Sequence, residues 1–282
     1  MRSGLRVRRT LLHTAVSTAT VALQGAFAAL FPSDCRVCGV PLASISRLPV
    51  CSRCVRAMAP VSGQTCAVCG EWLAREVSVE PKVCGECEAD RPLFTQATAY
   101  GAYDAELREL IHLLKYERVL PAAAVLGRML AEAIRKLTLP AGSLLVVPVP
   151  LHRSKRRQRG FNQCELIARA ALKQLPELHA RLSAGLLVRR RATVSQVGLT
   201  RSQRAENIHG AFEVAHLNQV AGSSILLVDD VLTTATTAAE CARVLRKAGA
   251  KDVWVATVAR TFKSHAADFE TGLDEELAVQ AQ

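Results

Sequence analysis

Apolar residues recur at two different periods along the chain, and the change of period predicts its elements. At residues 105–116 and 122–137 they return every three or four positions, which predicts two helices. A compact apolar run at residues 144–149, ended by Pro150, is typical of a buried strand. Further helices are expected at 164–175 and 237–248, and strands at 186–188, 225–228 and 253–258. This alternation predicts an α/β fold, with a parallel sheet covered by helices on both faces.

The amino-terminal 31 residues admit two interpretations. Residues 1–9 are basic, an apolar stretch follows, and Ala26-Phe27-Ala28 resembles a signal-peptidase site, as in a secretory leader. The alternative is an amphipathic helix that packs on the protein or contacts a membrane surface peripherally. Separate apolar and polar stripes favour this helix, because a leader does not need that order. No other segment reaches the roughly 18 apolar residues of a transmembrane span, and we expect a cytoplasmic protein.

Composition narrows the class of partner. Half of the 282 residues are apolar, which allows a sizeable core. Lys and Arg number 36 against 25 Asp and Glu, for a formal net charge of +11, and this excess predicts attraction to phosphate-rich partners. Aromatic residues make up only 4%, which leaves few platforms for stacking single-stranded DNA.

Eight of the ten cysteines form four C-x-x-C pairs within residues 35–87. The spacing suits structural zinc in a reducing cytosol better than disulfides, free cysteines or a redox pair. We expect metal, rather than an apolar core, to order residues 31–91. The first pair can share a zinc ion with the second and the third with the fourth, but a crossed grouping, and one ion or two, stay open. The predicted ligands are Cys35, Cys38, Cys51, Cys54, Cys66, Cys69, Cys84 and Cys87.

Residues 225–237, I-L-L-V-D-D-V-L-T-T-A-T-T, predict a strand that ends in two carboxylates, a hydroxyl-rich turn and a helix. Ligands of parallel sheets gather at the carboxyl ends of strands, where the amino terminus of the next helix attracts phosphate. Asp229 and Asp230 can accept hydrogen bonds from a ribose diol. The alternative is a threonine-capped helix after an acidic turn.

Two other polar stretches are candidates for substrate contacts. Five of the seven residues from 153 to 159 are cations, and a basic loop of this kind can neutralise a diphosphate leaving group. The alternative is a solvated loop or a nucleic-acid patch. Residues 196–212 form a polar stretch with the length and character of a lid.

Residues 225–237 resemble the phosphoribosyl diphosphate signature of type I phosphoribosyltransferases. The order of motifs resembles the ComF family, including GntX-like proteins: cysteine pairs, K-Y at 115–116, V-P-V-P-L-H followed by R-G-F-N-Q, Q-x-G-L-T-R-x-x-R-x-x-N, and then the signature. The resemblance spans residues 12–260. It implies a type I phosphoribosyltransferase fold behind a double zinc ribbon, a substrate bound with Mg²⁺, and a link to DNA uptake in competence or, in the GntX-like branch, to gluconate transport.

The resemblance also implies roles for single residues. Asp229 and Asp230 would hold the ribose hydroxyls and, with Arg159 of the diphosphate loop, form the catalytic group. Ala235 stands where the family usually has glycine, which puts phosphate affinity in doubt if the position needs a positive φ. The implied substrate-binding residues are Thr233, Thr234, Ala235, Thr236, Thr237, Arg153, Lys155, Gln196 and Arg204.

Two functions follow from these features. The first is an enzyme that transfers phosphoribosyl to an unknown acceptor, mostly by positioning and electrostatics because no residue is an evident general base. The second is a non-catalytic module that senses phosphoribosyl diphosphate, or binds single-stranded DNA or a protein of the competence machinery. The expected parts are an amino-terminal helix (1–31), a double zinc ribbon (32–92), a phosphoribosyltransferase domain (93–263) and a flexible tail (264–282).

Overall fold

The computed structural model describes residues 33–42, 46–73, 82–192 and 201–262. The chain divides into two compact units between Met58 and Ala59. The first unit contains the first two cysteine pairs and α2 (Ser52–Ala57). The second contains the other two pairs, α3 (Gly85–Ala89) and the sheet. The expected amino-terminal helix and flexible tail lie outside the described residues.

Five strands of the described chain form one parallel sheet, in the order β1-β7-β6-β2-β3. Leu226 in the middle strand lies opposite Val146 on one side and Trp254 on the other. Strand β2 is buried at every position, which explains its uninterrupted apolar run. The predicted parallel sheet is therefore confirmed. Its strands are β1 (Gln96–Ala102), β2 (Leu144–Pro148), β3 (Ala180–Leu182), β6 (Ser224–Leu232) and β7 (Asp252–Arg260).

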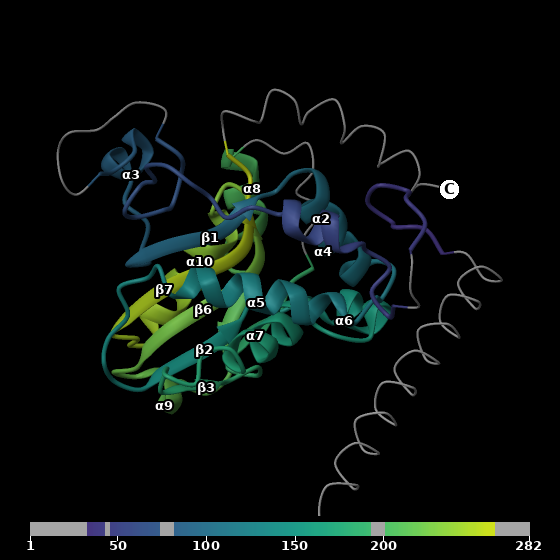
Figure 1. The fold of residues 1–282 in the computed structure, drawn as a ribbon. Coiled ribbons are helices and arrows are strands. Elements are labelled where there is room, and N and C mark those ends of the chain that lie inside the picture. The colour runs from purple at the N-terminus through teal and green to yellow at the C-terminus, as the bar shows by residue number, and fades with distance from the viewer. Residues whose placement is uncertain (1–32, 43–45, 74–81, 193–200, 263–282) are drawn as a thin grey trace, which may run out of the picture. The chain divides into compact units, whose positions relative to one another are not determined.

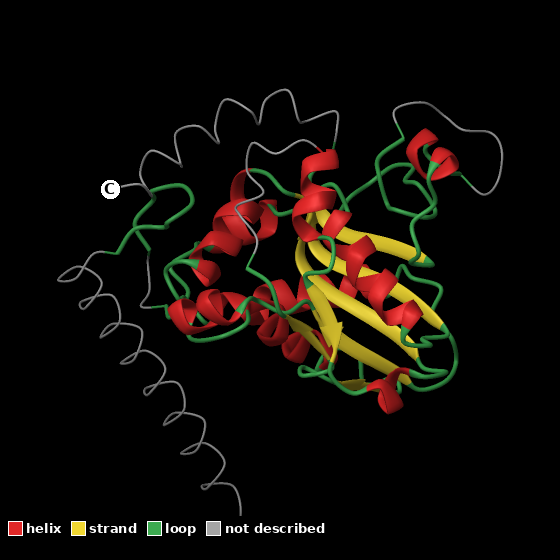
Figure 2. Cartoon of the chain, turned by 180° about the vertical axis from the view of Figure 1, so that it is seen from behind, coloured by secondary structure: helices red, strands yellow, loops and turns green. Residues whose placement is uncertain are grey.

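Helices cover both faces of this sheet (Figures 1 and 2). On one face α5 and α7 pack against each other, with α4 beside α5, and on the other lies α10. A side chain at Gly127 of α5 would overlap Ala170 of α7, so glycine permits this close approach. The bounds are α4 (Ala105–Lys115), α5 (Ala122–Ile134), α7 (Gln163–Leu172) and α10 (Thr236–Lys247).

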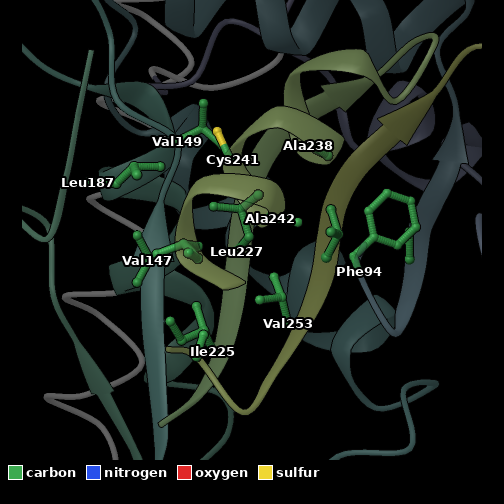
Figure 3. Close-up of a cluster of buried hydrophobic side chains, with 14 of the residues drawn as sticks. Phe94, Val147, Val149, Leu187, Ile225, Leu227, Ala238, Cys241, Ala242 and Val253 are labelled. Atoms are coloured by element: carbon green, nitrogen blue, oxygen red, sulfur yellow. The ribbon is translucent and has the colours of Figure 1, made fainter. Parts of the chain in front are cut away.

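The apolar core beneath α10 also includes part of the cysteine-rich segment. Figure 3 shows Val147, Ile225 and Leu227 from the strands beside Cys241 and Ala242 of α10. The same buried cluster contains cysteines of the third and fourth pairs, so the expectation that metal alone orders residues 31–91 is wrong for its second half. These members are Cys66, Cys69 and Cys87.

Three local predictions need correction. The strand expected at 186–188 is β4 (Leu187–Arg189), which pairs antiparallel with β5 (Phe212–Val214) in a separate sheet. The basic segment is a helix, α6 (Arg153–Arg159), rather than a loop, because Arg, Lys and Gln favour helices and Gly160 ends it at φ +86°. Part of the polar stretch at 196–212 is helical as well, in α8 (Arg201–Ile208), and α9 (Leu217–Val220) follows β5.

Candidate functional site

The eight paired cysteines gather in two groups of four within the described chain. Sulfur atoms of neighbouring cysteines are 3.9 Å apart for Cys35 and Cys54, and 3.7 Å apart for Cys69 and Cys84. Zinc–sulfur bonds of about 2.3 Å in a tetrahedron place sulfurs about 3.8 Å apart, so both groups fit zinc. The first pair is grouped with the second and the third with the fourth, which excludes the crossed alternative.

Hydrogen bonds prepare one sulfur in each group to act as a thiolate. The backbone N–H of Cys51 donates to Cys35 Sγ at 3.2 Å, and that of Cys84 donates to Cys66 Sγ at 3.3 Å. Although burial acts to raise it, backbone hydrogen bonds lower the pKa of Cys35 to about 6. A hydrogen bond from Cys69, together with backbone N–H groups, lowers the pKa of Cys66 to about 4. Thiolates of this kind are the form that binds a metal.

The two adjacent aspartates lie within β6, which continues to Leu232, and not at its end as expected. Asp229 Oδ1 accepts a hydrogen bond from the Cys164 thiol at 3.2 Å and from the Asp230 backbone N–H at 2.9 Å. Asp230 Oδ2 accepts from Gln163 Nε2 at 2.7 Å and pairs with the Lys115 ammonium at 3.0 Å. The other oxygen of each carboxylate has no hydrogen-bond partner among the described residues.

Charge at this acidic pair is balanced from within the protein. Burial, followed by the negative charge of Asp230, raises the pKa of Asp229 to about 7. Burial acts against the charge of Lys115, but the Asp230 carboxylate raises the pKa of Lys115 above its usual value. Ligand atoms of Cys164, Asp229 and Asp230 lie within 4.8 Å of one another. The Lys115 ammonium and the Cys164 proton already occupy positions that a cation would take, so this group does not fit a metal.

The R-G-F-N-Q segment supports the acidic pair from the amino terminus of α7. Arg159 donates a hydrogen bond to Gln163 and lies 5.5 Å from the centre of the Tyr116 ring. Asn162 caps α7 and donates to the Val149 carbonyl at 3.0 Å. Arg159 therefore reaches the acidic pair through Gln163.

The hydroxyl-rich turn joins the end of β6 to α10. Ala235 caps the helix in the left-handed conformation, at φ +58°. The hydroxyls of Thr234 and Thr236 lie 2.7 Å apart, and Thr233 is exposed. The first amides of a helix lack intrahelical partners, so this turn offers donors for an anion. The position of Ala235 does require a positive φ, and for a non-glycine residue this costs roughly 1–2 kcal/mol.

The structure brings together some of the predicted substrate-binding residues and not others. Thr233 to Thr237 follow the acidic pair after two residues of β6 and form the turn and the first two residues of α10. Arg153 and Lys155 are exposed on α6 and make no contact with the acidic pair in the described structure. Gln196 lies outside the described residues. Arg204 lies in α8, and its side chain is not among those described.

Three residues at the acidic pair were missed by the assignment of roles from the sequence. Gln163 and Cys164 begin α7, and Lys115 ends α4 next to the buried Leu113 and Leu114. A lysine adjoining an apolar helix face is a signal that it has a buried counter-charge. For Cys164 the isolated position in the sequence gave no signal.

The two parts of the chain each match a known protein domain. Residues 26–88 match the double zinc ribbon domain, and residues 163–273 match the phosphoribosyl transferase domain. The DNA utilization protein YhgH of Escherichia coli (strain K12) is 33% identical over 233 residues, which are 82% of this chain and 98% of that protein. Competence protein F of Haemophilus influenzae is 29% identical over 225 residues, 77% of this chain and 92% of its own. The chain belongs to the ComF family.

A further relative and one solved structure are similar to the chain over part of its length. Competence protein ComFC of Bacillus subtilis (strain 168) is 26% identical over 208 residues, 71% of this chain and 79% of its own. A solved structure of the allosteric regulatory enzyme of purine biosynthesis covers 49% of this chain and 26% of its own, with 22% identity and a TM-score of 0.31. The predicted combination of a double zinc ribbon with a phosphoribosyltransferase domain is confirmed. Within the described part of this ComF-family chain, no helix has the length and apolar character needed to cross a bilayer.

Proposed function

We propose that this protein binds the magnesium complex of phosphoribosyl diphosphate at the carboxyl edge of β6 and transfers its phosphoribosyl group to an acceptor. The observation that carries the proposal is the arrangement of Asp229 and Asp230. Each commits one oxygen to protein donors and leaves the other without a described partner. Adjacent ribose hydroxyls are donors that suit two such oxygens.

The position of the phosphate turn supports the same ligand. It follows the acidic pair after Val231 and Leu232, so a ribose held by the carboxylates would have its 5-phosphate near the turn. Threonine hydroxyls and the free amides at the start of α10 are suitable phosphate donors. Parallel sheets commonly bind ligands at this edge.

In the proposed reaction the bond between the anomeric carbon and the diphosphate oxygen breaks, and the diphosphate leaves with the electron pair. A lone pair of the acceptor forms the new bond to that carbon, and the acceptor's proton passes to solvent. The carboxylates of Asp229 and Asp230 would stabilise positive charge that develops on the ribose. Arg153 and Lys155 of α6, with the Mg²⁺ that accompanies the substrate, would offset the charge of the departing diphosphate.

The biological setting is proposed from the relatives. Their printed names are DNA utilization protein and competence protein, and we propose that this protein serves the uptake or use of DNA. The described cysteines are free of disulfides, as zinc thiolates require, and this is in keeping with a cytoplasmic location.

Calorimetry with zinc-replete protein and the magnesium complex of phosphoribosyl diphosphate tests the proposal. We expect binding by the wild type and a loss of about 100-fold or more in the Asp229→Asn, Asp230→Asn variant, because about 1.5–3 kcal/mol is lost for each hydrogen bond to a charged group. Asp252→Asn, at the opposite end of the sheet, is the matched control and should bind normally. Diphosphate release with a panel of bases and amines then tests transfer. Absence of binding by folded wild-type protein would contradict the proposal.

A second candidate is a module that senses phosphoribosyl diphosphate and binds single-stranded DNA or a protein partner. The observation that favours it is the exposed basic surface of α6, formed by Arg153, Lys155, Arg156 and Arg157. This function predicts ligand binding without diphosphate release. It also predicts oligonucleotide affinity that falls steeply with salt, and less steeply after these four cations are changed to Gln.

A further inference from the structure

Arg260, the last residue of β7, directs its side chain into the second cysteine cluster. It is 4% exposed. Its Nη1 donates to the Cys69 carbonyl at 2.8 Å, and its Nη2 lies 2.7 Å from Glu71 Oε2 and 3.9 Å from Cys69 Sγ. Every described partner of the guanidinium thus belongs to the turn that carries Cys69. A buried cation is tolerated only with such partners, so the contact fixes this turn against β7.

The backbone of Arg260 contacts the edge of the sheet where the proposed ligand binds. Arg260 pairs with Leu232, the last residue of β6, and the N–H of Thr261 donates to the Leu232 carbonyl at 3.0 Å. The next residue after Leu232 is Thr233, which begins the phosphate turn. Figure 1 shows β7 lying between β1 and β6. A single residue therefore joins the second cysteine cluster to the start of this turn.

Close packing around Arg260 leaves the junction little freedom to move. A side chain at Gly70 would lie 2.8 Å from the Ala97 carbonyl oxygen, and the Ala97 N–H donates to the Val68 carbonyl at 2.7 Å. Trp72 packs edge-on against Phe262, with ring centres 5.9 Å apart. A displacement of the second cluster would therefore shift the end of β7.

We propose that Arg260 is a positioning residue that couples zinc retention at the second cysteine cluster to ligand binding at the phosphate turn. Zinc with four thiolates carries a net charge of about −2, which the adjacent guanidinium offsets. When zinc leaves, the turn with Cys69 loses the metal that fixes it, so Arg260, bound to the Cys69 carbonyl and to Glu71, no longer holds the strand end beside Leu232 in place. The coupling rests on the proposed function and is reciprocal in affinity, so ligand binding must tighten zinc binding at the second cluster.

The test measures zinc affinity by equilibrium competition with a chromogenic chelator, with and without the magnesium complex of phosphoribosyl diphosphate. The Cys35→Ser, Cys38→Ser variant holds zinc only at the second cluster and therefore shows which cluster responds. We expect the ligand to raise the zinc affinity of the second cluster by roughly 5- to 150-fold, the usual range of coupling between sites, and to leave that of the first cluster unchanged.

Arg260→Met should abolish this gain in zinc affinity and, because the coupling is reciprocal, the gain in ligand affinity that zinc provides. Arg260→Lys keeps the charge and should rescue part of the effect, which a loss of packing alone would not predict. Arg135→Met removes an exposed ion pair with Glu177, of 3.2 Å, and is the matched control.

The outcomes separate this coupling from the proposed function. Ligand that binds the wild type without raising the zinc affinity of the second cluster overturns the coupling alone. A full gain of zinc affinity in Arg260→Met also overturns it, and if that variant does not fold, comparison of Arg260→Lys with the wild type decides. Absence of ligand binding by the wild type overturns the proposed function and the coupling together.

Discussion

The two cysteine clusters share one ligand chemistry and differ in their surroundings. In the first, Cys35 and Cys54 are buried and lie in the small unit that ends at Met58. In the second, three of the four cysteines belong to the apolar core that continues into the sheet and α10. A zinc site can thus organise a small unit by itself, or form one wall of a larger core. The second arrangement makes the metal a determinant of the domain's stability.

The glycines that follow a cysteine pair in each cluster also differ in how closely they are packed. Gly39 and Gly70 each follow the second cysteine of a pair and have nearly equal φ values, +71° and +73°. A Cβ at Gly39 would meet nothing within 4 Å, whereas one at Gly70 would lie 2.8 Å from a backbone oxygen. The turn needs glycine for its conformation in both clusters, but only the second also needs it for packing.

The largest difference between the two clusters is expected when their zinc-binding cysteines are replaced. Cys66→Ser, Cys69→Ser should lower the free energy of unfolding of the sheet domain by more than about 3 kcal/mol or prevent folding, because structural zinc contributes folding energy directly. Cys35→Ser, Cys38→Ser should change it by less than about 1 kcal/mol, as for substitutions away from the core. Denaturant unfolding followed by fluorescence of the buried Trp254 measures both. Equal losses would show that the clusters do not differ as described.

A smaller contrast is expected at the two glycines. Gly39→Ala should lower the free energy of unfolding by about 1 kcal/mol, because the left-handed conformation costs about 1–2 kcal/mol and the reduced freedom of the unfolded chain offsets about 0.4–1 kcal/mol of this. Gly70→Ala should lower the free energy of unfolding by about 2–4 kcal/mol, since overpacking against a fixed carbonyl adds to the strain of the left-handed conformation. Both variants retain all eight zinc ligands, so zinc content serves as the control. Similar losses of stability in the two variants would mean that the Ala97 carbonyl moves aside without a cost in free energy.

The sequence predicts what is local in these clusters and misses what is distant. Paired cysteines are near one another in the chain, so their spacing alone indicates zinc binding, whereas the grouping of the pairs into two sites came from the structure. The ion pair between Arg260 and Glu71 joins residues 189 positions apart, and no periodic pattern links them. That the second cluster belongs to the core therefore became evident only from the structure.

At the acidic site, too, the sequence predicts the residues that are contiguous and misses those that the fold brings together. Asp229, Asp230 and the turn after them are contiguous, and a strand, turn and helix could be predicted together. Lys115 and Gln163 reach the carboxylates from α4 and α7, which the fold alone brings there. The basic segment was predicted as a loop because its charge suggested exposure, although helix propensity and Gly160 decide its conformation.

The two units should also differ in how their stability depends on pH, because the unit with the second cluster contains the acidic pair. The pKa of Asp229 is raised to about 7 by burial and by Asp230. The unfolded state releases this proton near pH 4 and the folded state only near 7, so stability falls as pH rises between these values. The ribose hydroxyls prefer the ionised carboxylate, so affinity should be about tenfold higher at pH 8 than at pH 6.

Calorimetry from pH 6 to pH 8 measures the affinity, after correction for ionisation of the free ligand's phosphates. Asp229→Asn should bind weakly at every pH and should be more stable than the wild type at pH 8, since it removes a carboxylate that folding disfavours. An unchanged affinity of the wild type across this range would contradict the assignment of the ribose to Asp229.

The smallest effect is expected at Ala235, which mirrors Gly39 in the other unit. Ala235→Gly removes the strain of a left-handed alanine, which stabilises the folded state by about 1–2 kcal/mol. It also gives the unfolded chain more conformational freedom, which offsets about 0.4–1 kcal/mol of that gain. The free energy of unfolding should therefore rise by up to about 1 kcal/mol, close to the reverse of Gly39→Ala. Ala239→Gly, within α10, is the matched control and should cost about 1 kcal/mol. If Ala235→Gly is instead destabilising, contacts of the alanine methyl hold the turn, and its conformation is not the strained one that φ +58° implies.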